Sequence, residues 1–183
     1  LPSHREVVAV NYLPFLLRSR YWGWSVTPES VAVLGAGQGP LGEATAVILA
    51  CFIAGGGSEA TSLVLELAAR GELPAEAIGR QLALVLRRTW RETRTAIAGL
   101  REPAEAGAHH EVWRILRALL PELWPGEGQR PTVSQTELVS FAAEVAQWAG
   151  ARGEIPCVAE QARSRRTSRF ARECRALHAV LTG

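Results

Sequence analysis

Two copies of one short phrase constrain the fold of this chain more than any other feature of its sequence. Ala69-Arg-Gly-Glu-Leu-Pro74 returns as Ala151-Arg-Gly-Glu-Ile-Pro156, and the copies start 82 residues apart. In each copy an apolar pattern of helical spacing ends on Gly, and another begins with Pro. Gly accepts the left-handed conformation of a helix C-terminus, and Pro suits a first helical turn. Because 82 residues is about twice the roughly 40-residue period of HEAT-like repeats, the two copies predict stacked helical hairpins.

Apolar residues recur at helical spacing along most of the chain, and this periodicity predicts about ten helices. Pro14 is expected to kink or break the first helix, and Pro103 argues against helix in the second half of the sixth. We expect an all-α fold of stacked antiparallel hairpins, either a HEAT-like α-solenoid or an irregular helical bundle. Residues 1–183 are predicted to form one helical-repeat domain, with a candidate sub-boundary in the loop 126–133. The predicted helices cover residues 4–20, 27–34, 40–54, 58–70, 74–88, 91–106, 108–120, 134–150, a short segment from 156, and 168–181.

The composition is that of a folded globular domain. Of the 183 residues 48% are apolar, and mean hydropathy is +0.05. No apolar run reaches the roughly 18 residues that a membrane span requires, and no signal-peptide pattern is visible. Three widely spaced cysteines, Cys51, Cys157 and Cys174, indicate a reducing cytoplasm and small buried side chains. The chain contains no Met, so we expect it to be a piece of a longer protein.

Every one of the 20 basic residues is Arg, and every one of the 18 acidic residues is Glu. The absence of Asp excludes Ser-His-Asp chemistry and Asp-rich metal sites within this sequence. No Walker loop, Gly-x-Ser-x-Gly elbow or Cys-x-x-Cys pair is present. His109-His110-Glu111 begins a predicted helix, but Trp113 and Arg114 occupy the positions at which a zinc-binding helix would carry its further ligands. We therefore predict no catalytic residue, no metal site and no cofactor.

One motif keeps an enzyme-like alternative open. Gly37-x-Gly39-x-x-Gly42 follows an apolar, β-branched run, as in a dinucleotide-binding fold whose backbone approaches a pyrophosphate. Glu66 lies 24 residues after Gly42, near the expected place of a ribose-binding acid. Against this Rossmann-like interpretation, residues 27–30 form a helix-capping sequence, and no strand pattern follows residue 75. The favoured interpretation is a helix–loop–helix in which these glycines form a tight turn.

Two groups of residues are candidates for binding a partner. Trp22 and Trp24 belong to an aromatic turn that either covers one end of the core or binds a peptide or a ring-shaped ligand. Arg165, Arg169 and Arg172 share one face if this basic stretch is helical, and such a face could meet phosphates or an acidic partner. We expect contact with another protein, with nucleic acid as the alternative. A net charge of +2 is too small to imply a polyanion partner for the whole domain.

Four parts of the sequence carry a resemblance to a known family: Gly23-Trp-Ser-Val-Thr-Pro28, Gly39-Pro-Leu-Gly-Glu-Ala44, Ala69-Arg-Gly-Glu-Leu73 with Gly79-Arg-Gln-Leu82, and Ala151-Arg-Gly-Glu-Ile-Pro156. In these parts the chain resembles the C-terminal region of large, uncharacterised actinobacterial helical-repeat proteins of HEAT-like type. The resemblance implies gene neighbours that encode SWIM zinc-finger, von Willebrand A and MoxR ATPase proteins, and hence an adaptor or scaffold role. The predicted function is a non-enzymatic, cytoplasmic helical scaffold that mediates protein–protein interaction within a larger multidomain bacterial protein, away from membranes.

Overall fold

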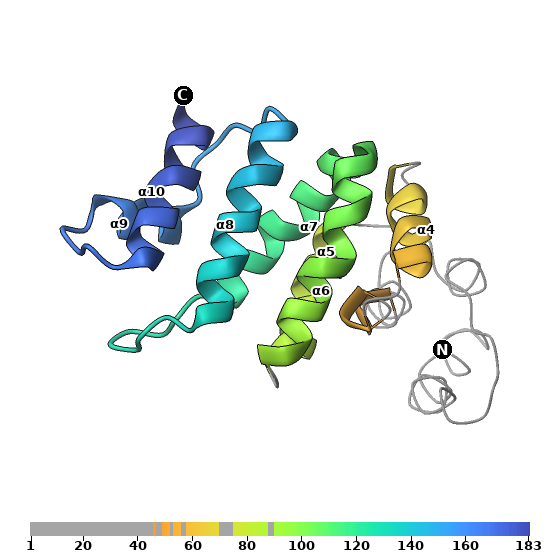
Figure 1. Cartoon of the computed structure of the whole chain (residues 1–183), viewed down its shortest axis with the longest axis horizontal. Helices are drawn as coiled ribbons and strands as arrows, with labels where there is room; N and C mark the ends of the chain where they lie inside the picture. The colour runs from red at the N-terminus through yellow and green to blue at the C-terminus, as the bar shows by residue number, and fades with distance from the viewer. Residues whose placement is uncertain (1–45, 47–48, 52, 56–57, 70–74, 88–89) are drawn as a thin grey trace, which may run out of the picture.

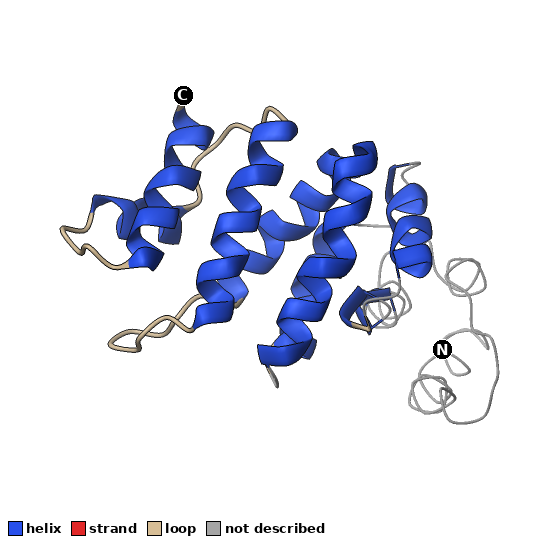
Figure 2. Cartoon of the chain, viewed as in Figure 1, coloured by secondary structure: helices blue, strands red, loops and turns tan. Residues whose placement is uncertain are grey.

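The regular elements of the described structure are all helices (Figure 2). The computed structural model of the chain describes residues 46, 49–51, 53–55, 58–69, 75–87 and 90–183. These residues contain no strand, which confirms the predicted all-α class for this part of the chain. None of its helices is long and apolar enough to cross a membrane. The elements are α4 (Ser58–Ala69), α5 (Ala75–Leu86), α6 (Trp90–Pro103), a π-helical turn η2 (Ala104–Ala108), α7 (His109–Glu122), α8 (Val133–Trp148), α9 (Pro156–Arg163) and α10 (Arg169–Thr182).

The alternate helices α4, α6, α8 and α10 lie side by side, as do α5 and α7. In Figure 1, α4, α6, α8 and α10 form a row, and each contacts the next member of that row. The starts of α8 and α10 are close, because Gln135 in the first turn of α8 donates to the Leu123 carbonyl at 2.7 Å, and the ring of the next residue, Trp124, lies 5.1 Å from the Phe170 ring of α10. Their ends are also close, because the Gly153 N–H donates to the Leu181 carbonyl at 3.2 Å. These two helices therefore run in the same direction, and the chain returns through α9 between them.

One apolar core runs through the helices from α4 to α10. The stripe predicted for residues 108–120 is buried, as are Leu138, Val139 and Val145 of the stripe predicted for α8. Trp148 is different: it was predicted to belong to the α8 stripe, but it is 41% exposed. It is the last residue of α8, so its side chain lies past the buried turns. The core includes residues on both sides of the loop 126–133, and the sub-boundary there stays a prediction.

The second copy of the repeated phrase lies between α8 and α9, as predicted. Gly150, just before this phrase, has a φ of +56°, the left-handed conformation that Gly adopts without strain. Its N–H donates to the Gln147 carbonyl, and the Ala151 N–H donates to the Ala146 carbonyl. These two bonds form a Schellman motif, which satisfies carbonyls at the end of α8. Pro156 then opens α9 at its first position.

The two copies of the phrase do not mark helix ends at the same position. α4 ends at Ala69, the first residue of its copy, whereas α8 ends three residues before Ala151. The Gly that caps α8 is Gly150, which lies outside the phrase. The expectation that the phrase's own Gly ends the helix is therefore wrong for the second copy. Residues 70–74 of the first copy lie outside the described residues.

α6 continues through Pro103, where the sequence argued against a helix. Proline lacks the backbone N–H that would donate to the carbonyl four residues earlier, and the α-helical pattern changes to the π-helical turn directly after it. The π-helical turn that follows contains Gly107 with a φ of +115°, so the helical path breaks there and not at the proline. α7 then contains Pro121 and extends to Glu122, two residues past the predicted end.

The predicted helices at 4–20 and 27–34 lie outside the described residues, as does the first part of the one at 40–54. The described residues between 46 and 54 are helical. The expectation of about ten helices therefore stays a prediction, and the described residues contain seven α-helices with defined bounds, α4 to α10.

Candidate functional site

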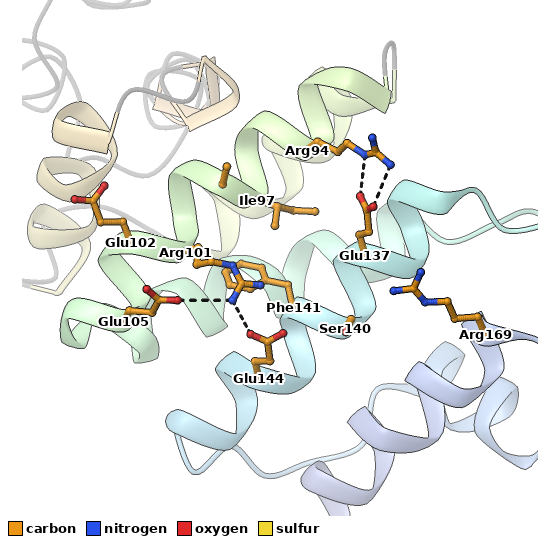
Figure 3. Close-up of a pocket in the computed structure, with 11 residues that line it drawn as sticks. Arg94, Ile97, Arg101, Glu102, Glu105, Glu137, Ser140, Phe141, Glu144 and Arg169 are labelled. Carbon is orange, nitrogen blue, oxygen red and sulfur yellow. Dashed lines mark hydrogen bonds and ion pairs between the residues drawn. The ribbon is translucent and has the colours of Figure 1, made fainter.

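A groove of about 640 Å³ opens between α6 and α8 (Figure 3). Its lining combines apolar side chains, among them Ile97 and Phe141, with charged side chains from both helices. Arg169 borders the groove from α10, and Figure 3 shows its side chain pointing toward α8. The groove therefore lies across three members of the row that α4, α6, α8 and α10 form.

Two ion pairs join the facing sides of α6 and α8. Arg94 binds Glu137 with two hydrogen bonds, from Nε to Oε2 at 2.9 Å and from Nη2 to Oε1 at 3.0 Å. Arg101 donates from Nη1 to Glu144 Oε2 at 2.7 Å. In both pairs the acid lies 43 residues after the arginine, so α6 and α8 run parallel and in one register. Bidentate guanidinium–carboxylate contacts are geometrically specific, which suits them to hold that register.

Arg101 contacts three side chains in the groove. Besides Glu144, its Nη1 lies 3.7 Å from Glu105 Oε1, and its guanidinium carbon lies 4.9 Å from the centre of the Phe141 ring. A cation over an aromatic face is attracted to the ring quadrupole. The hydrogen bond to Glu144 raises the pKa of Arg101, although burial opposes the shift. The Phe141 side chain itself is only 1% exposed, so the groove presents mainly ion-paired charges and the partly exposed Ile97.

Sequence reasoning missed this groove, although one signal was present. Arg94 and Arg101 are seven residues apart, and so are Glu137 and Glu144. On a helix this spacing puts both members of each set on one face, two turns apart. The sequence therefore allowed the prediction that the face with Arg94 and Arg101 pairs with the face that carries the two glutamates. Local spacing does not tell which helices are neighbours, so the match needed the tertiary structure.

Ion pairs of the same kind join α5 to α7. Arg114 donates to both carboxylate oxygens of Glu76, at 2.8 Å and 3.0 Å. The hydrogen bond from Arg114 lowers the pKa of Glu76, although burial opposes the shift. Arg87, just past the end of α5, donates to the carbonyl of Glu122 at 2.8 Å and to its carboxylate at 3.0 Å. The first of these pairs joins the start of α5 to the first half of α7, and the second joins the ends of both helices, so α5 and α7 also run parallel.

The three predicted partner-binding arginines do not share one helix. α10 begins at Arg169, so Arg165 lies in the loop between α9 and α10. The expected shared face requires a helix through all three positions, and Arg165 lies in a loop, where helical spacing does not apply. Arg169 and Arg172 do lie on α10, three residues apart, and all three side chains are exposed. The other candidates, Trp22 and Trp24, lie outside the described residues.

The residues of the dinucleotide-binding alternative are only partly described. Gly37, Gly39 and Gly42 lie outside the described residues. Glu66 is exposed on α4, and the segment 63–67, a strand in that alternative, lies inside this helix. The absence of any strand from the described part of the chain does not favour a Rossmann-like domain.

The histidines and cysteines form no metal-binding group within the residues that the structure describes. His109 and His110 open α7 with ring centroids 4.6 Å apart. Cys174 is fully buried, and burial raises the pKa of its thiol to about 12. Burial also raises the pKa of Cys157, which, like Cys51, is only partly buried. The expectation of a buried thiol is therefore confirmed for Cys174, and thiols with raised pKa values are weak nucleophiles near neutral pH.

Comparison of the chain with protein-family models, with curated proteins and with solved structures finds no match. The resemblance to actinobacterial helical-repeat proteins therefore stays a prediction.

Proposed function

We propose that this chain is a non-enzymatic helical scaffold that holds a segment of another protein in the groove between α6 and α8. The row of parallel alternate helices, from α4 to α10, supports a HEAT-like α-solenoid. A helical hairpin cannot bury its apolar stripe alone and must stack on its neighbours, and stacking leaves an extended face open to partners. The observation that carries the proposal is the groove itself, held in register by the pairs that Arg94 and Arg101 form with α8.

The chemistry of the groove suggests what the bound segment carries. Ile97, which is partly exposed, provides an apolar centre, and charged side chains surround it, as in many protein–protein interfaces. Glu102 and Glu105 line the α6 side and are exposed, whereas Arg169 borders the opposite side from α10. A matching segment presents an apolar side chain to the centre, a basic one toward α6 and an acidic one toward α10.

A displayed library of random peptides, selected on the folded chain, tests the proposal. Ala98 is exposed on α6 and lines the groove, so Ala98→Arg fills part of the groove with a long charged side chain. Ala69 is exposed at the end of α4, outside the groove, so Ala69→Arg is the matched control. We expect selected peptides to lose affinity at least about tenfold for Ala98→Arg and to bind Ala69→Arg unchanged. Equal binding to both variants, or selection of no peptide, would contradict a groove that binds protein segments.

A further inference from the structure

The positive charge of this chain is concentrated in one short segment. Residues 163–175 contain six arginines and one glutamate, a formal charge of +5, whereas the whole chain carries only +2. The remaining residues therefore carry −3. The segment covers the end of α9, the following loop and the first half of α10. We call its four exposed arginines in and after the loop the arginine corner: Arg165, Arg166, Arg169 and Arg172.

The arginine corner differs from Arg94, Arg101 and Arg114, because no glutamate of another described helix pairs with it. Arg94 and Arg101 of α6, and Arg114 of α7, pair with glutamates of neighbouring helices at 2.7 to 3.0 Å. In the corner, Arg169 reaches only Glu173 of its own helix, at 3.9 Å. Arg165, Arg166 and Arg172 form no ion pair with any residue that the structure describes. Their charge is therefore available to a partner, without an internal pair to break first.

The backbone under the arginine corner is held in place at both ends. The Ser168 hydroxyl accepts a hydrogen bond from the Ala171 N–H and caps α10. Arg175 Nη1 donates to the Arg166 carbonyl at 3.2 Å, which ties the loop to α10. At the other end, the Ser164 hydroxyl donates to the Gln161 carbonyl at 2.7 Å. A backbone ordered in advance reduces the entropy lost on binding.

We propose that the arginine corner is a second binding surface, which meets the groove at Arg169, and that it takes a short acidic segment of another protein. Guanidinium groups match carboxylates in a planar, two-bond geometry. This chain uses that geometry itself, between Arg94 and Glu137 and between Arg114 and Glu76. A segment rich in glutamate or aspartate completes the same contact from outside. Charge attraction of this kind raises association rates and selects partners by sign.

Two observations favour an acidic protein segment over a nucleic acid. Single strands bind through aromatic side chains on which bases stack, but the aromatic residue of this segment, Phe170, is 3% exposed and packs on Trp124. A long polyanion would also extend past the corner onto a chain that carries −3 elsewhere, which repels it. A short acidic segment remains inside the positive region.

Fluorescence anisotropy with the full chain tests this surface. The probe is a fluorescein-labelled peptide of alternating glutamate and alanine, and its glutamine analogue is the neutral comparison. We expect Arg165→Gln, Arg166→Gln and Arg172→Gln together to weaken binding of the acidic peptide about tenfold at low salt. Arg169 is retained because it also borders the groove, so a negative result here leaves the groove proposal untouched. Affinity of the unaltered chain should also fall as salt concentration rises.

The matched control removes the same charge elsewhere. Arg80, Arg117 and Arg130 are exposed on α5, on α7 and in the following loop, and replacing all three by Gln should change affinity by less than about twofold. The variants should keep the far-ultraviolet circular dichroism of the unaltered chain, because the substituted side chains are exposed. The proposal is overturned by equal losses in both triple variants or by no binding of the acidic peptide. Tighter binding of a labelled DNA single strand or duplex, lost in the corner variant, also overturns it and assigns the surface to nucleic acid.

Discussion

Replacement of Gly79 by Ala tests the close approach of α5 to α7. A Cβ at Gly79 would lie 2.4 Å from the carbonyl oxygen of Ile115 and 2.9 Å from the Cβ of Ala118. Optimal carbon contacts lie at about 3.5 Å or more. The carbonyl belongs to the backbone of α7, so no side-chain rotation relieves the contact. The two helices must separate, which loosens the packing of the buried α5 side chains, Leu82 among them.

Two opposing effects determine the size of the change. Alanine is favoured over glycine by about 1 kcal/mol inside a helix. Overpacking in a well-packed core costs about 1 to 3 kcal/mol, and a 2.4 Å contact with backbone belongs at the upper end. The loss of packing along α5 adds to this cost. We therefore expect Gly79→Ala to lower the free energy of unfolding by about 2 kcal/mol, or the Tm by about 4 to 8 °C for a chain of this size.

Urea unfolding followed by far-ultraviolet circular dichroism measures this effect. Arg80→Ala, at the exposed neighbouring position of α5, is the control and should change the free energy of unfolding by less than about 0.5 kcal/mol. Adding Ala118→Gly to Gly79→Ala removes the Cβ contact and leaves the carbonyl contact. The double variant should therefore recover less than half of the unfolding free energy that Gly79→Ala loses, as a double-mutant cycle measures. An increase in stability of about 1 kcal/mol for Gly79→Ala would refute the reasoning, because helix propensity would then act unopposed.

Three further measurements test other parts of the structure. Thr132→Ala should lower the free energy of unfolding by about 1 kcal/mol, because the Thr132 hydroxyl accepts from the Gln135 N–H at 3.1 Å and caps α8. An unchanged urea midpoint would contradict that role. A double-mutant cycle on Arg94 and Glu137 should give a coupling of about 0.5 kcal/mol that falls with added salt, because both side chains are partly exposed; a salt-independent coupling would argue against this ion pair. Stability should also fall as pH rises from about 9 toward about 12, because the Cys174 thiol keeps its proton in the fold up to a pKa of about 12 and loses it near 9.0 when unfolded. In Cys174→Ala the fall in stability should be shallower by at most about 1.4 kcal/mol per pH unit. Urea titrations of both proteins between about pH 9 and about pH 12 measure this difference. Identical pH profiles would contradict a raised pKa for Cys174.

Local signals in the sequence predicted the described helices well. Pro156 opens α9, and Ser168 caps α10, as their residue types indicate. The apolar stripe of α7, with Ile115 and Leu116 on its buried side, follows from spacing alone. Such features depend on residues within about four positions of one another, which the sequence shows directly. The same locality explains the errors: Trp148 continues the spacing but lies where the helix ends.

By itself, then, the sequence determined the all-α class of the described part, most of its helix limits and which helical faces turn inward. Only the tertiary structure decided which helices are neighbours, and therefore that Arg94 meets Glu137 and that Gly79 touches the backbone of α7. Those contacts join residues 36 to 43 positions apart, and their geometry depends on how whole helices cross. The packing of the helices also decided which arginines have a carboxylate of a neighbouring helix within reach. Arg101 meets a carboxylate across α6 and α8, whereas the arginine corner lies beyond the reach of the described glutamates of any neighbouring helix.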